Sequence, residues 1–189
     1  MEAWLYALIS LSILGGISLF LMALKFHYGF IITFFFQGSL YISVTVWESP
    51  LWNPGDGIDC VGGWDWLWGL WGLMFMFLIP LAFLSMFIYA QSREEKYKIF
   101  GKYYSIEASI FLMLLVGNWF TFGVVEDFGC YIIWGLENFH TYAAIIHGDA
   151  FLWGIPSLYW YIIPGLILQV LAFSLSRMLK MRRIKSLKT

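Results

Sequence analysis

Long apolar runs separated by short polar segments dominate this chain of 189 residues. A helix rises about 1.5 Å per residue, so about 20 apolar residues cross the roughly 30 Å hydrocarbon core of a membrane. The pattern predicts five transmembrane helices, at about 4–24, 29–47, 64–90, 106–125 and 151–174. We therefore expect one all-α domain over residues 1–189, a polytopic integral membrane helix bundle.

The basic residues fall into three groups, each beside the end of a predicted span. Lys25 follows the first span, a second group lies between the third and fourth spans, and the last forms a tail over 177–189. Cytoplasmic segments of membrane proteins are enriched in Lys and Arg. Five spans place all 11 basic residues on one side. Because the basic side is expected to be cytoplasmic, this arrangement predicts an outer N-terminus and a cytoplasmic C-terminus.

Composition supports a multi-pass protein of a cell membrane or an energy-transducing membrane. The chain is 61% hydrophobic and only 12% charged, whereas soluble domains carry roughly 25% charged residues. The net charge is −1, and no basic nucleic-acid-binding module is visible. We expect the lipid bilayer as a partner, and no nucleic acid.

Most acidic residues fall on the side opposite the basic groups. Without Lys or Arg beside them, these carboxylates must be solvated, hydrogen-bonded, protonated or bound to cations. They are Glu2, Glu48, Asp56, Asp59, Asp65, Glu126, Asp127, Glu137 and Asp149. Cys60 and Cys130 fall on the same side, where an oxidising exterior would allow them to form a disulfide between two outer loops. The alternative is two separate buried thiols.

The outer segment from Cys130 to Asp149 predicts a short amphipathic helix at the membrane interface. Glu137, His140 and His147 fall on one face of it, and Asp149 follows. Glu-x-x-His spacing occurs in di-metal helix bundles, and carboxylate with imidazole suits Zn, Cu, Fe or Mn. These four residues are our predicted metal site. The alternative is an ordinary amphipathic helix with its polar face at the lipid headgroups.

Asp127 and Asp149 form a second candidate site, because two neighbouring carboxylates can divide the roles of acid and base. The segment at 117–149 resembles part of the lipoprotein signal peptidase family, which places such a pair of carboxylates at the outer membrane edge. The likeness rests on Gly-Asn at 117–118 and on the positions of the two Asp residues. The family's Asp-Arg is replaced by Trp-Phe at 119–120, and its Phe-Asn-x-Ala-Asp by the residues at 146–149. The resemblance implies peptidase activity only as one alternative.

Few polar residues lie within the predicted spans. Gln37, Asn118 and Gln169 are neutral, and we expect them to form hydrogen bonds between helices. Tryptophans gather near the outer span ends, which is typical of an aromatic belt. The alternative is an aromatic-lined pocket for a lipid, quinone or isoprenoid.

Three functional interpretations follow, and the sequence does not decide whether the protein is an enzyme. The first is a metal-binding membrane enzyme or redox subunit with an acidic, histidine-bearing outer site. The second is a non-catalytic accessory subunit of a larger, respiratory-type membrane complex. The third is a lipid- or quinone-binding membrane protein.

Overall fold

The computed structural model describes residues 1–26, 28–51, 96–99, 102–147 and 150–186. Within these ranges, four helices are long and apolar enough to cross a membrane. They are α1 (Ala3–Ala23), α2 (Tyr28–Leu51), α5 (Ile106–Trp134) and α7 (Ile162–Ser186). The predicted span at 64–90 lies outside the described residues.

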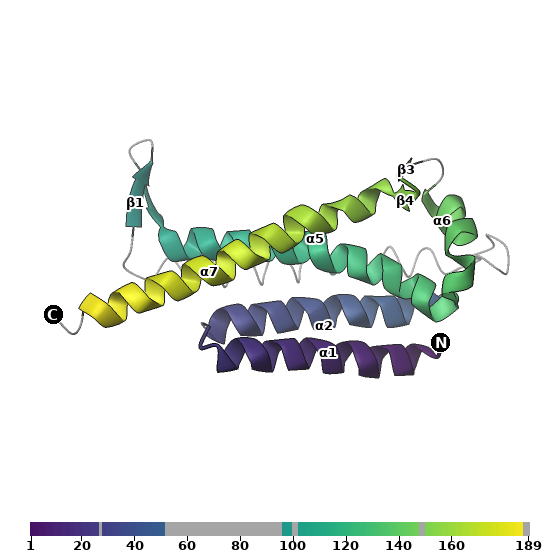
Figure 1. The fold of residues 1–189 in the computed structure, drawn as a ribbon, viewed down its shortest axis with the longest axis horizontal. Helices are drawn as coiled ribbons and strands as arrows, with labels where there is room; N and C mark the ends of the chain where they lie inside the picture. Colours follow the sequence, from purple (N-terminus) through teal and green to yellow (C-terminus); the bar gives the residue numbers. More distant parts are fainter. Residues whose placement is uncertain (27, 52–95, 100–101, 148–149, 187–189) are drawn as a thin grey trace.

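The four long helices form one bundle (Figure 1). Helices α1 and α2 are an antiparallel hairpin, joined by a tight turn in which Lys25 adopts a positive φ of 61°. Helix α5 packs against α2 and also against α7, and it touches α1. The start of α1 and the end of α7 lie at opposite ends of the bundle (Figure 1).

One end of the bundle collects the basic segments. The α1–α2 turn, the hairpin of β1 (Lys96–Ile99) and β2 (Lys102–Ser105), and the C-terminal end of α7 all lie there (Figure 1). The Nζ of Lys180 donates a hydrogen bond of 3.3 Å to the Lys25 carbonyl. We call this the basic end. The opposite end, where α1 begins and α2 and α5 end, is the acidic end.

Helix α5 is longer than the predicted span, which stops at 125. Apolar and aromatic residues resume after Asp127 and extend the helix to Trp134. Gly135 then ends it with a φ of 112°, a conformation that suits glycine. Cys130 consequently lies inside the helix and not in an outer loop.

The final helix begins later than the predicted start at 151. Two short strands, β3 (Phe151–Leu152) and β4 (Ile155–Pro156), and the 3₁₀ helix η4 (Ser157–Tyr161) come first. The turn between the strands needs positive φ values at Trp153 and Gly154. Helix α7 then continues beyond the predicted end at 174 into the basic tail.

The predicted amphipathic segment is divided into shorter pieces. After α5 come the 3₁₀ helix η3 (Leu136–Asn138) and the helix α6 (Phe139–His147). The ring of Phe139 packs edge-on against Tyr131 of α5, with ring centroids 5.0 Å apart. This contact holds the start of α6 against the acidic end of the bundle. Its position at a membrane interface stays a prediction.

A layer of three amides crosses the interior of the bundle. The Nδ2 of Asn118 donates to Gln37 Oε1 at 2.5 Å, and the Nε2 of Gln169 donates to Asn118 Oδ1 at 2.9 Å. All three side chains are buried. The expected hydrogen bonds between helices are therefore confirmed, and they join α2, α5 and α7.

Candidate functional site

Three side chains with metal-binding atoms meet at the acidic end, where α2 packs on α5. One carboxylate oxygen of Glu48, one of Glu126 and the Sγ of Cys130 all lie within 4.8 Å of one another. Glu126 and Cys130 share a face of α5 because they are four residues apart. Glu126 is 6% exposed and Cys130 is 3% exposed. We call these three residues the acidic cluster.

The acidic cluster brings two carboxyls close together in a largely buried setting. The carboxyls of Glu48 and Glu126 lie close enough for a side-chain hydrogen bond. The Oε1 of Glu126 is buried and has no hydrogen-bond partner in the described part of the chain. Every described Lys and Arg belongs to segments at the basic end. A buried carboxylate beside a second carboxyl is costly unless a proton or a cation lies between them.

Helix contacts hold the acidic cluster in place. Thr45 Oγ1 on α2 donates to the Glu126 carbonyl at 3.2 Å. Gly129 allows the Tyr6 hydroxyl of α1 to approach α5, since a Cβ at position 129 would overlap that oxygen. The Trp134 indole donates to the Ser49 carbonyl at 2.8 Å. The site thus rests on three packed helices, which favours a fixed arrangement of ligands.

Asp127 faces a different neighbour from Glu126. The hydroxyl of Tyr159, on η4, donates a hydrogen bond of 2.5 Å to its Oδ2. Successive residues of a helix point about 100° apart, which separates the two carboxyls of α5. Asp149 lies outside the described residues, so the catalytic pair Asp127 and Asp149 stays a prediction.

The predicted metal ligands on α6 and η3 do not join the acidic cluster in the described part of the chain. Glu137 and His140 are exposed, and the His140 ring packs edge-on against Phe139 at 5.4 Å. The His147 side chain and Asp149 lie outside the described residues. The metal site formed by these four residues stays a prediction.

The structure does not support the expected disulfide. Cys130 is a free, buried thiol within α5, and Cys60 lies outside the described residues. The expectation placed Cys130 in an outer loop because it ended the fourth span too early. The thiol instead faces the two glutamates.

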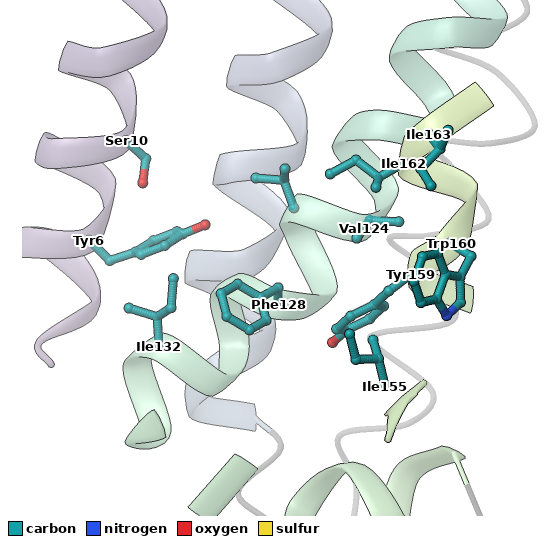
Figure 2. Close-up of a pocket in the computed structure, with 11 residues that line it drawn as sticks. Tyr6, Ser10, Val124, Phe128, Ile132, Ile155, Tyr159, Trp160, Ile162 and Ile163 are labelled. Atoms are coloured by element: carbon teal, nitrogen blue, oxygen red, sulfur yellow. The ribbon is translucent and has the colours of Figure 1, made fainter. Parts of the chain in front are cut away.

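Two cavities lie between the helices, and one of them reaches the acidic cluster. One of about 410 Å³ lies between α1, α5 and the start of α7. Figure 2 shows Tyr6 and Ser10 reaching it from α1, Phe128 and Ile132 from α5, and Tyr159 and Trp160 from η4. A second cavity, of about 320 Å³, lies among α1, α2, α5 and α7 and includes Glu126 in its wall.

The chain matches no known protein family, and it matches no curated protein and no solved structure. The proposed function therefore rests on the geometry of the acidic end.

The sequence pattern did not assign Glu48 to either predicted site. Its place in the acidic cluster depends on how α2 packs against α5, because Glu48 and Glu126 are 78 positions apart along the chain. One signal was present, since Glu126 and Cys130 have the i, i+4 spacing of one helix face.

Proposed function

We propose that the chain is a multi-pass integral membrane protein with five spans, an outer N-terminus and a cytoplasmic C-terminus. The four long apolar helices support the membrane assignment. The chain leaves the described part at the acidic end, after α2, and re-enters it at the basic end, at β1 (Figure 1). An odd number of spans accounts for both of these positions and for the gathering of basic segments at one end.

In this orientation the acidic cluster lies near the outer membrane surface, and its function is to bind a transition-metal cation. The observation that carries this proposal is the approach of two carboxylates and one thiol to within 4.8 Å, with Glu126 and Cys130 buried. Thiolate and carboxylate ligands together suit Zn²⁺ better than Mg²⁺ or Ca²⁺. Three protein ligands leave the fourth position of a tetrahedral ion open to water or substrate.

Metal analysis of the purified full chain, after exposure to Zn²⁺ and removal of excess metal, tests this function. We expect about one Zn²⁺ per chain, and a loss of at least tenfold in retained metal for Glu126→Gln and for Cys130→Ser, because each removes a charged ligand. Glu137→Gln and His140→Ala are the matched controls and should retain the metal.

Two results would contradict the acidic cluster as the metal site. One is the absence of stoichiometric metal in the unmodified protein. The other is metal that is lost in His140→Ala but kept in Cys130→Ser, which would locate the ion at the predicted histidine-bearing site.

A further inference from the structure

The turn between α1 and α2 ends α1 with a lysine at a position that usually carries glycine. The Lys25 N–H donates to the Met22 carbonyl at 2.8 Å. The next N–H, of Phe26, donates to the Leu21 carbonyl at 3.2 Å, and the two bonds together are the Schellman pattern of helix ends. Lys25 has the left-handed φ of 61° that this pattern requires, which glycine adopts freely and a residue with a Cβ does not. Lys25 therefore places a positive charge at the end of α1 against the preference of the backbone.

Two basic residues of α7 contact this turn. The Nζ of Lys180 donates to the Lys25 carbonyl at 3.3 Å. The guanidinium carbon of Arg177 lies over the Phe26 ring, 5.6 Å from its centroid, within the range of a cation–π interaction. The Phe26 ring is itself packed against Phe173, with centroids 5.4 Å apart. Arg177 and Lys180 are neighbours on the helix surface because they are three residues apart, so three basic residues meet at the turn. We call Lys25, Arg177 and Lys180 the basic triad.

The basic triad forms no ion pair with a carboxylate in the described part of the chain. All three residues are exposed. Glu107, in the first turn of α5, is the only acidic residue described at the basic end. Neighbouring cations repel one another, and an anion between them removes that cost. Guanidinium and ammonium groups are the side chains that bind phosphate in proteins. The arrangement is therefore suited to a phosphate that comes from outside the chain.

The basic triad lies at the depth expected for lipid headgroups. Helix α1 has 21 residues and is about 32 Å long, enough to cross the hydrocarbon core. Lys25 follows this helix directly. Exposed apolar side chains surround the basic ones on α7, at Leu175, Met178 and Met181. A phospholipid offers a phosphate to the cations and acyl chains to these apolar side chains, whereas a soluble acidic protein offers only the charge.

We propose that the basic triad binds the phosphate of one anionic phospholipid, in the leaflet at the basic end. Arg177 and Lys180 donate hydrogen bonds to the phosphate oxygens, Lys25 adds a third positive charge, and the acyl chains lie along the exposed apolar side chains of α7. An anionic lipid is favoured over a zwitterionic one, because the triad repels a cationic headgroup. The inference rests on the membrane assignment of the proposed function. It does not depend on the metal, since the acidic cluster lies at the opposite end of the bundle (Figure 1).

Native mass spectrometry of the purified full chain in detergent tests the lipid site. The probes are phosphatidylglycerol and phosphatidylcholine with identical acyl chains. We expect one tightly held phosphatidylglycerol per chain and binding of phosphatidylcholine that is at least about tenfold weaker. Arg177→Gln and Lys180→Gln should each raise the dissociation constant for phosphatidylglycerol about tenfold, since each removes a charge-assisted hydrogen bond. Added salt should weaken the binding of phosphatidylglycerol more than that of phosphatidylcholine.

Lys25→Gly separates lipid binding from folding. The substitution removes the charge, keeps the carbonyl that accepts from Lys180, and relieves the left-handed conformation. The variant should therefore unfold in lipid-free detergent at the same temperature as the unmodified protein or at a higher one. It should nevertheless bind phosphatidylglycerol about tenfold more weakly. Unchanged affinity for phosphatidylglycerol in Lys25→Gly would contradict the basic triad.

Arg182→Gln is the matched control. It removes the same charge from an exposed residue of the same helix, two positions beyond Lys180 and therefore on another side of α7. Its affinity for phosphatidylglycerol should stay within about twofold of the unmodified value. Equal weakening in Arg182→Gln and in the triad variants would mean attraction to diffuse charge, and it would overturn the proposal.

Two further results would also overturn the lipid site. One is equal binding of the two lipids. The other is displacement of phosphatidylglycerol by polyglutamate, which would indicate an acidic protein as the partner. Metal content should be unchanged in the triad variants, and Cys130→Ser should bind phosphatidylglycerol as the unmodified protein does. The lipid site and the metal site can therefore fail separately.

Discussion

Asn118 accepts one hydrogen bond and donates another in the middle of the bundle, and in this way a single side chain joins two neighbouring helices to α5. In a membrane such bonds are worth about 0.6 kcal/mol each on average, and up to about 1.7 kcal/mol. Asn118 lies about 12 Å along the helix axis from Glu126, eight residues further on at about 1.5 Å per residue. The same helix therefore carries both the central residue of the amide layer and one carboxyl of the acidic cluster.

At the residue scale, Asn118→Leu should lower the free energy of unfolding by about 1–2 kcal/mol, because it leaves the Gln37 and Gln169 amides buried without their partner. Thermal unfolding in detergent measures the change. Ser43→Ala is the control, since Ser43 is exposed and bonds only within its own helix, to the Ser39 carbonyl. If Asn118→Leu were as stable as Ser43→Ala, the amide layer would have no part in holding the helices together.

Helices α5 and α7 approach each other through small residues. An added Cβ at Gly117 would lie 2.9 Å from the Gly165 carbonyl oxygen, and one at Gly165 would lie 2.9 Å from the Thr121 backbone nitrogen. Backbone atoms cannot move aside as a flexible side chain can, so the close crossing requires glycine at both positions.

At the element scale, Gly117→Ala should destabilise the bundle by about 1–3 kcal/mol, through overpacking against backbone atoms. Gly16→Ala is a matched control within α1, where an added Cβ meets nothing within 4 Å. Alanine favours a helix over glycine by roughly 1 kcal/mol, so this control should be neutral or slightly stabilising. Equal unfolding temperatures for the two variants would refute the close crossing of α5 and α7.

Sequence reasoning succeeded where a pattern is local. Apolar runs predicted all four of the long helices that the structure describes, and the three intramembrane amides were expected to bond across helices because hydrocarbon offers them no other partner. It failed at the helix ends. The fourth span was predicted to end at 125, although the apolar residues after Asp127 extend α5 to Trp134.

Local sequence patterns could not predict the acidic cluster. Glu48 and Glu126 come from different helices, and their approach depends on the packing of α2 against α5. Gly129 allows this packing, since a Cβ there would lie 2.7 Å from the Thr45 methyl of α2. Hydrophobic periodicity alone does not determine the distance between two helices or the rotation of each helix about its axis. The sequence therefore located the acidic side of the protein, and helix packing determined which acids meet there.

The whole molecule has an acidic end and a basic end, and the proposed topology assigns them to opposite sides of the membrane. We expect an N-terminal tag to react with an impermeant label in sealed cells, and a C-terminal tag to react only after permeabilisation, because the basic segments lie in the cytoplasm. Both tags reacting from the same side would refute the odd number of spans. Both reacting with the opposite sidedness would refute only the orientation.

The measurement that tests the central claim most directly is X-ray absorption at the zinc edge of the metal-loaded, full-length protein. The acidic cluster predicts one sulfur at about 2.3 Å together with oxygen ligands at about 2.0–2.2 Å. The sulfur contribution should disappear in Cys130→Ser. A spectrum of the unmodified protein with nitrogen and oxygen ligands alone, and with the scattering pattern of imidazole, would contradict binding by Glu48, Glu126 and Cys130.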